Sequence, residues 1–177
     1  FLLFGAHGDL ATRMLWPSLF RLHCDKSLPN QMVVYGLGRS GTTQELREQL
    51  HQSLADEVND ANRAQFEQFL EKTAYIKLEA AQELDYQTLA KYLAEKSQHV
   101  ALAYLSMPPD LFAPIVENLH HAELINPDTR IILEKPIGKD LASSRAISDG
   151  VAEVLVEQQT YRIDHYLGKE AVQNLLA

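Results

Sequence analysis

Short apolar runs alternate along the chain with longer amphipathic segments. The short runs are rich in Val, Ile, Leu and Tyr, as strands buried on both faces tend to be. We expect strands over residues 1–4, 31–35, 75–77, 100–105, 130–133 and 160–162. Apolar residues at helical spacing predict helices over 8–22, 43–56, 62–70, 85–96, 110–121 and 141–158. In the first helix, one apolar side carries Leu10, Met14, Leu15 and Leu22.

This alternation also predicts the fold class. Repeated strand-helix units form a parallel sheet with helices on both faces. We therefore expect one domain over residues 1–177 with a doubly wound, Rossmann-like α/β fold. Ligands of such domains bind at the carboxyl ends of the strands, near the point where the strand order reverses. Residues that directly follow strands are therefore the candidates for function.

A glycine-rich segment from Gly5 to Ala11 follows the first strand and opens the first helix. Its glycines let the backbone turn tightly, and the N–H groups at a helix start can hold a phosphate. The spacing is G-x-x-G-x-x-A, with Ala6 where the usual dinucleotide fingerprint has its second glycine. A purely structural strand-to-helix turn would give the same pattern. His7 could touch a phosphate or face solvent.

The residues after the second strand bear on the choice of cofactor. NAD-selective sites usually place Asp or Glu there, whereas this chain has Arg39 and Ser40 after Gly38. An arginine can bind the additional 2′-phosphate of NADP and stack on adenine, and Thr42 or Thr43 could add hydroxyl donors. If the first turn binds phosphate, Arg39 therefore indicates NADP as the cofactor. Without such a turn, a solvated loop arginine is the better interpretation.

Glu134-Lys135-Pro136 follows the fifth strand. Pro136 has no N–H and ends strand pairing, and the bond before it is a candidate for the cis form. Lys135 could hydrogen-bond a substrate hydroxyl and the nicotinamide ribose. A solvated lysine at a strand exit would look the same.

The segment 162–170 follows the sixth strand. Within it, His165, Tyr166 and Lys169 offer the donors that a sugar phosphate needs. Asp164 could orient a catalytic histidine from elsewhere, as a carboxylate orients imidazole in hydrolytic triads. The alternative is a helix-capping loop in which Asp164 is the cap.

Composition narrows the classes of partner. The chain has 177 residues, 46% of them hydrophobic, which is typical of one soluble globular domain. Its net charge of −8 disfavours nucleic acid and anionic membranes, and no apolar run reaches the length of a membrane span. The single cysteine, Cys24, cannot form an internal disulfide, which fits a cytoplasmic protein. We expect no metal site. The sequence begins inside a strand-like run and ends in a helical run without a stop signal, so we expect it to be part of a longer chain.

These segments together resemble the glucose-6-phosphate dehydrogenase family. The matching pieces, in the order of that family, are 5–11, 38–40, 104–109, 134–138 and 162–170. The last piece is the signature of the family and is highly specific, whereas the glycine-rich turn is shared with many folds. His7 departs from the small or basic residues of the family at its position.

The resemblance implies NADP-dependent oxidation of β-D-glucose 6-phosphate at C1 to 6-phosphogluconolactone, the first step of the pentose phosphate pathway. The pyrophosphate would be cradled by Gly5, Ala6, His7, Gly8, Asp9, Leu10, Ala11 and Thr12. The 2′-phosphate would be bound by Arg39 and Ser40, with Tyr104 and Lys135 as further cofactor contacts. The sugar phosphate would be bound by Lys135, His165, Tyr166 and Lys169. Catalysis would involve Lys135 and Asp164, the latter as support for the base.

By the same resemblance, the base itself is a histidine on a larger second domain, built on an antiparallel sheet beyond residue 177. We expect residues 1–177 alone to turn over little or nothing, the full-length protein to be a homo-oligomer, and this part by itself to be a possible monomer. Two rival interpretations stay open. A different sugar oxidoreductase would explain Glu134-Lys135-Pro136 but not the segment 162–170. A domain that senses NADP without chemistry would not need the sugar-phosphate cluster.

Overall fold

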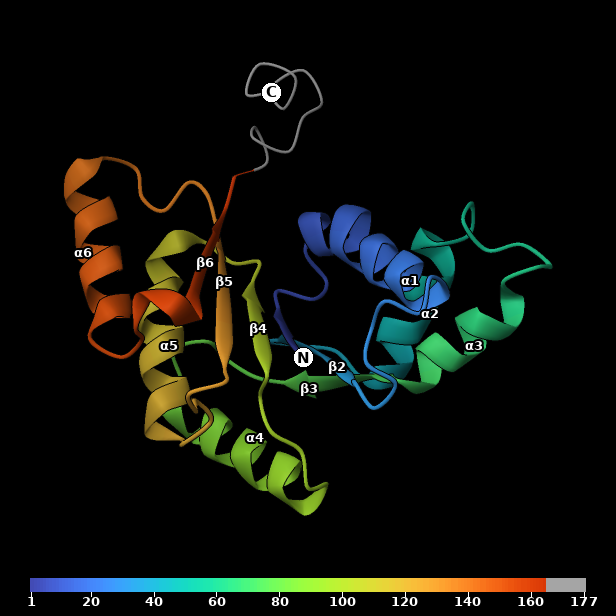
Figure 1. Cartoon of the computed structure of the whole chain (residues 1–177), viewed down its shortest axis with the longest axis horizontal. Coiled ribbons are helices and arrows are strands. Elements are labelled where there is room, and N and C mark those ends of the chain that lie inside the picture. The colour runs from blue at the N-terminus through green and yellow to red at the C-terminus, as the bar shows by residue number, and fades with distance from the viewer. Residues whose placement is uncertain (165–177) are drawn as a thin grey trace.

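A computed structural model describes residues 1–164, so the predicted roles of His165, Tyr166 and Lys169 lie outside the described residues. Six strands form one sheet in the order β3-β2-β1-β4-β5-β6 (Figure 1). All neighbouring strands are parallel. The strands are β1 (Leu2–Phe4), β2 (Val34–Gly38), β3 (Thr73–Lys77), β4 (Leu102–Leu105), β5 (Arg130–Glu134) and β6 (Thr160–Ile163). This is the doubly wound order, and the predicted fold class is confirmed.

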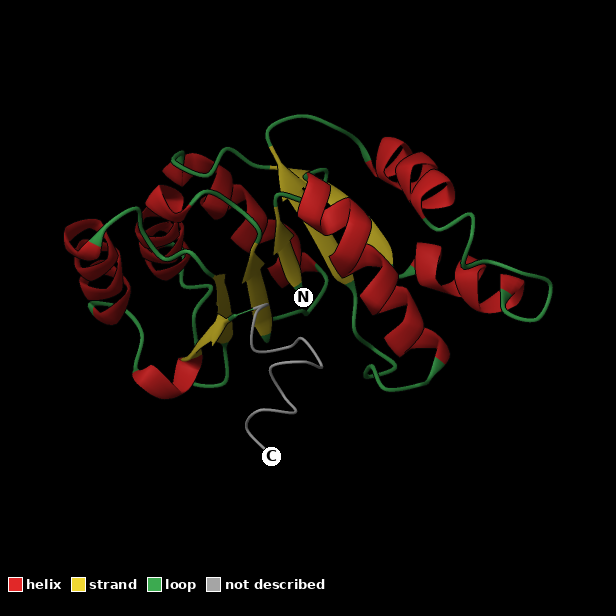
Figure 2. Ribbon diagram, turned by 90° about the horizontal axis from the view of Figure 1, so that it is seen from above, coloured by secondary structure: helices red, strands yellow, loops and turns green. Residues whose placement is uncertain are grey.

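Helices cover both faces of the sheet, with α1, α2 and α3 on one face and α4, α5 and α6 on the other (Figures 1 and 2). The α-helices are α1 (Trp16–Cys24), α2 (Thr43–Ser53), α3 (Arg63–Glu71), α4 (Glu83–Glu95), α5 (Phe112–His121) and α6 (Leu141–Ala152). Residues 1–164 also contain three short helical segments: η1 (Ala11–Leu15), η2 (Pro109–Leu111) and η3 (Glu157–Gln159).

The sheet divides the hydrophobic core into two clusters. Successive side chains of a strand point to opposite faces. Leu2 and Phe4 of β1 therefore join the cluster beneath α4–α6, whereas Leu3 joins Trp16 and Phe69 on the other face. All three residues of β1 are buried. Short apolar runs without alternation thus mark strands that are covered on both sides.

The first helix buries a different side from the apolar side that the sequence pattern predicts. Met14 is 53% exposed and Leu22 is 41% exposed. The buried residues are Ala11, Trp16, Pro17, Leu19 and Phe20. The reason is that η1 is a π-helical segment. A π turn adds a residue to a helical turn and rotates all later positions, so regular spacing misplaces the buried side.

The second strand is displaced toward the carboxyl side of its predicted position, to Val34–Gly38. Gly36 lets the strand pass close to Ala6, because a Cβ atom on residue 36 would lie 2.8 Å from the Cβ of Ala6. The strand therefore ends at Gly38, and Arg39 follows it directly at the ligand edge of the sheet.

Candidate functional site

The turn after β1 has a conformation that requires glycine at one position. Gly5 has a φ of +74°, and a Cβ atom there would lie 2.2 Å from the carbonyl oxygen of Ser106. The N–H groups of Gly5 and Ala6 donate to the carbonyl of Leu37 at 3.0 and 3.2 Å, and the N–H of Gly8 donates to the Gly5 carbonyl at 2.8 Å. Ala6 is fully buried. An alanine therefore fits where the usual fingerprint has glycine, because this side chain points into the core.

A pocket of about 350 Å³ lies at this turn. Its walls come from Gly5–Gly8, from Gly38–Ser40 and from Ser106–Pro108, which follow β1, β2 and β4. The strand order reverses between β1 and β4, and this switch point is where ligands of doubly wound sheets bind. The volume lies within the range of small-molecule sites. The structure thus brings the predicted pyrophosphate and 2′-phosphate segments into one pocket.

Arg39 and Ser40 are exposed at the rim of this pocket. The hydroxyl of Tyr75 donates to the Ser40 carbonyl at 2.7 Å and holds the loop. Burial raises the pKa of Tyr75, so this phenol stays a neutral donor. Sequence reasoning missed Tyr75. The one hint in the sequence is the glycine at position 38, because a Cβ atom there would lie 2.6 Å from the Tyr75 hydroxyl.

The hydroxyls of Thr42 and Thr43, which the sequence offers as further phosphate donors, both have partners within the fold. Thr42 is the N-cap of α2 and accepts from the N–H of Glu45 at 3.2 Å. Thr43 accepts from the N–H of Tyr75 at 2.9 Å. Thr42 therefore caps α2, and Thr43 fixes the start of this helix beside β3.

His7 also lines the pocket, and its ring contacts that of Tyr75 in a tilted arrangement, with a centroid distance of 4.7 Å and an interplanar angle of 38°. Its Nδ1 atom is hydrogen-bonded to the side-chain oxygen of Gln49 on α2. Sequence reasoning missed Gln49, which lies 42 residues from His7 and has no local signal.

Lys135 and Asp164 meet at the ends of β5 and β6. The Lys135 ammonium lies 3.0 Å from Oδ2 of Asp164, and the backbone N–H of Lys135 donates to the Ile163 carbonyl at 3.1 Å. The bond between Lys135 and Pro136 is cis, as the sequence suggests. The two predicted catalytic side chains are thus in contact, on the same edge of the sheet as the pocket.

Tyr104 is 6% exposed, and its hydroxyl donates to Oε1 of Glu134 at 2.7 Å. Burial, together with the bond to this carboxylate, raises the pKa of Tyr104 far above its usual value. The residue ties β4 to the end of β5. Its predicted contact with the cofactor stays a prediction.

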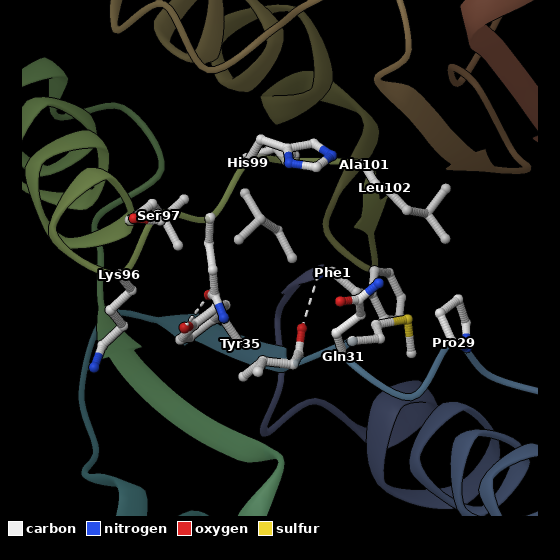
Figure 3. A pocket seen from close by; sticks show the side chains of 15 residues that line it. Phe1, Pro29, Gln31, Tyr35, Lys96, Ser97, His99, Ala101 and Leu102 are labelled. Carbon is white, nitrogen blue, oxygen red and sulfur yellow. Dashed lines mark hydrogen bonds between the residues drawn. The ribbon is translucent and has the colours of Figure 1, made fainter.

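A larger pocket of about 540 Å³ lies at the opposite edge of the sheet (Figure 3). It is lined by residues before or at the start of β1, β2 and β4, among them Phe1, Lys96 and His99. The hydroxyl of Tyr35 donates to Gln98 at 2.5 Å within it. Among the predicted site residues up to Asp164, none lines this pocket, so the smaller pocket is the candidate site.

Membrane-spanning helices and metal-binding clusters are both absent from residues 1–164. None of the helices there has both the length and the apolar character that a bilayer crossing requires. No group of three or more His, Cys, Asp or Glu side chains in that range is placed to hold a metal ion.

The strand order and the cradle at the switch point define a nucleotide-binding α/β domain. The chain belongs to the family described as glucose-6-phosphate dehydrogenase, NAD binding domain, which matches residues 2–174. The predicted family is thereby confirmed, and with it a nicotinamide dinucleotide as the cofactor of the domain.

Individual relatives agree with this assignment. The chain is 38% identical to glucose-6-phosphate 1-dehydrogenase of Gluconobacter oxydans, covering 100% of this chain and 37% of the relative. It is 40% identical to the enzyme of Zymomonas mobilis, covering 99% of this chain and 36% of the relative. A solved glucose-6-phosphate dehydrogenase in complex with its substrate matches with a TM-score of 0.85 at 32% identity, over 99% of this chain and 38% of the other. The chain thus spans little more than a third of these proteins.

Proposed function

We propose that this chain is the NADP-binding part of a glucose-6-phosphate dehydrogenase, which oxidises glucose 6-phosphate at C1 to 6-phosphogluconolactone. One observation carries the proposal: the nucleotide pocket and the contact between Lys135 and Asp164 share the carboxyl edge of one sheet. A dehydrogenase must hold cofactor and substrate side by side, and this edge offers groups for both. The names of the relatives support the same reaction.

The residues around the pocket fit a dinucleotide with a 2′-phosphate. The turn at Gly5 leaves no room for a Cβ atom against the Ser106 carbonyl, and it leads into a helix start, where backbone N–H groups can hold a pyrophosphate. Arg39 and Ser40 lie at the rim, where a guanidinium can pair with a phosphate in bidentate fashion. No carboxylate directly follows β2 to favour the ribose hydroxyls of NAD.

When bound, the nicotinamide ring accepts the hydride from C1. The chain itself contributes binding and orientation. Lys135 has a half-exposed ammonium that can donate to a sugar hydroxyl, and Asp164 holds that ammonium in place. We expect the base to be a histidine of the remaining part of the protein, supported by Asp164. Sugar-phosphate contacts from His165, Tyr166 and Lys169 stay predictions, as do a homo-oligomeric state and a cytoplasmic location.

The test is the affinity of the full-length protein for NADP and NAD, measured by calorimetry for the wild type and for Arg39→Ala. We expect NADP to bind more tightly, and Arg39→Ala to weaken NADP by about tenfold to a hundredfold with little change for NAD. Arg63→Ala is the matched control, because Arg63 lies at the start of α3 and pairs with Asp60 away from the pocket. Equal loss of both nucleotides in Arg39→Ala would contradict the assignment.

An activity assay separates an enzyme from a domain that only senses NADP. The full-length protein should form NADPH with glucose 6-phosphate and far less with glucose. Binding of NADP without any turnover would favour the sensor, and equal turnover of both sugars would favour a different sugar oxidoreductase.

A further inference from the structure

His7 is the last member of a hydrogen-bond network that begins at Thr12, and the bond of Thr12 fixes the donor and acceptor of each later bond. The Thr12 hydroxyl donates to the Gly8 carbonyl at 2.9 Å, so its oxygen is left to accept. The side-chain amide nitrogen of Gln49 donates to that oxygen at 2.5 Å. The amide oxygen of Gln49 therefore points to Nδ1 of His7.

This hydrogen-bond network sets the tautomer of the His7 imidazole. A carbonyl oxygen can only accept, so Nδ1 of His7 must carry a hydrogen and donate to Gln49. In a neutral imidazole, the other nitrogen is then the basic one. Nε2 of His7 is therefore the atom that gains a proton when the ring becomes charged.

Nε2 lies beside the loop that carries the predicted 2′-phosphate residues. A Cβ atom at Gly41 would lie 2.7 Å from Nε2, so the ring fills the space that this glycine leaves. Gly41 directly follows Arg39 and Ser40, and all three of His7, Arg39 and Ser40 line the pocket.

The surroundings of His7 hold charges of both signs, some of which are paired with each other. The titratable side chains on the elements packed against it are Asp9, Arg13, Arg39, Glu45, Arg47, Glu48, His51, Tyr75 and Lys77. Asp9 and Arg13 pair with each other at 2.8 Å, and Glu45 accepts from the Thr42 hydroxyl at 3.1 Å. The imidazole itself contacts the neutral side chains of Gln49 and Tyr75.

We propose that His7 is a titratable specificity residue whose protonated Nε2 contacts the phosphate on the adenine ribose of the cofactor. The inference rests on the function proposed above and adds a second, switchable cation beside Arg39. The preference for NADP over NAD then rises as pH falls, because only the protonated ring donates from Nε2. NAD has an uncharged hydroxyl in place of this phosphate, so its affinity should follow the charge of His7 far less.

The test measures the affinities of the full-length protein for NADP and NAD by calorimetry from about pH 6 to about pH 8.5, where an imidazole loses its charge. His7→Asn keeps an amide near Nδ1 and removes the nitrogen that titrates. His7→Gln places an uncharged amide near Nε2. His120→Asn, on the exposed end of α5, is the matched control. The phosphate has its own ionisation near a pKa of about 6, but this affects all variants equally and cancels in the comparison.

In the wild type and in His120→Asn, we expect the ratio of NADP to NAD affinity to fall about tenfold over this range relative to His7→Asn and His7→Gln. Identical pH profiles in all four proteins would overturn the role of His7 and leave the proposed function intact. The same pH dependence for NAD would also overturn it, because His7 would then contact the pyrophosphate. If NADP has no advantage over NAD at any pH and Arg39→Ala changes neither affinity, the proposed function itself fails.

Discussion

The ammonium of Lys135 lies 3.0 Å from the carboxylate of Asp164, and these two residues follow the last strand residues of β5 and β6. The lysine side chain is 51% exposed, whereas the carboxylate is 20% exposed. Such a partly exposed ion pair contributes less than about 1 kcal/mol to stability. Its effect is on position: the half-buried carboxylate limits where the lysine can reach.

We therefore expect Asp164→Asn to lower kcat/KM of the full-length protein for glucose 6-phosphate by about tenfold to a hundredfold with little change in unfolding temperature. Asparagine keeps the size of the side chain and removes its charge. Steady-state kinetics and thermal unfolding measure the two effects. Glu157→Gln is the control, because it breaks a comparable pair with Arg162 at 2.6 Å. Equal kinetics for the two variants would contradict a role for Asp164 in the reaction.

Gly5→Ala should destabilise the protein by about 2–4 kcal/mol and abolish nucleotide binding. The reason is the positive φ together with the carbonyl of Ser106 at 2.2 Å from the added atom. Urea unfolding and calorimetry measure both effects. Gly8→Ala should cost less, because its φ is ordinary and its nearest atom lies at 3.0 Å. A reversed order of the two variants would show that the turn differs from this geometry.

Tyr104→Phe should lower the free energy of unfolding by about 1–2 kcal/mol at neutral pH, because the buried bond to Glu134 is lost. The folded pKa of this phenol is raised, so its contribution is fully present below the unfolded pKa of about 10 and declines as pH rises above it. The difference between wild type and variant should therefore narrow above pH 10 in denaturant titrations. Tyr161→Phe, at an exposed residue of β6, should be neutral throughout.

Asp140 should contribute to stability above acid pH only. Its side chain caps α6 by accepting from the N–H of Ser143 at 2.8 Å, and this bond lowers the pKa of the carboxyl. A lowered folded pKa means that the contribution is present above the unfolded pKa of about 3.9 and is lost as pH falls through the folded value. Asp140→Asn should thus have a lower unfolding temperature than wild type at neutral pH and approach it below about pH 3. Asp128→Asn, in the turn before β5, controls for the loss of one surface charge.

The architecture could be predicted because each strand is a short apolar run and each helix an amphipathic one, so local pattern and final burial agree. Two local predictions missed because packing outweighed pattern. β2 extends through Gly36, a weak strand former, since the site needs a residue without a side chain against Ala6. The first helix buries Trp16 rather than Met14 because of the π turn, which no periodicity reveals.

The candidate site was predictable where its residues directly follow strands, as Gly5, Arg39 and Lys135 do. The contacts that these residues make could not be predicted from the sequence. Lys135 meets Asp164 because β5 and β6 are neighbours, and Tyr104 meets Glu134 because of the register between β4 and β5. The bond between His7 and Gln49 joins a loop to the second turn of a helix. Such pairings depend on strand order and helix placement, which the spacing of residues along the chain does not encode.

The central position of β1 has a consequence for how this site can change over evolutionary time. The strand is buried on both faces and lies between β2 and β4, so the turn at Gly5 continues the most enclosed part of the sheet. His7 and Arg39, by contrast, are exposed side chains at the rim. Amino-acid substitutions at the rim leave the packing of the interior unchanged, whereas substitutions at the Gly5 turn disturb it. Descendants of this fold can therefore drift in cofactor preference while the scaffold that holds the cofactor stays the same.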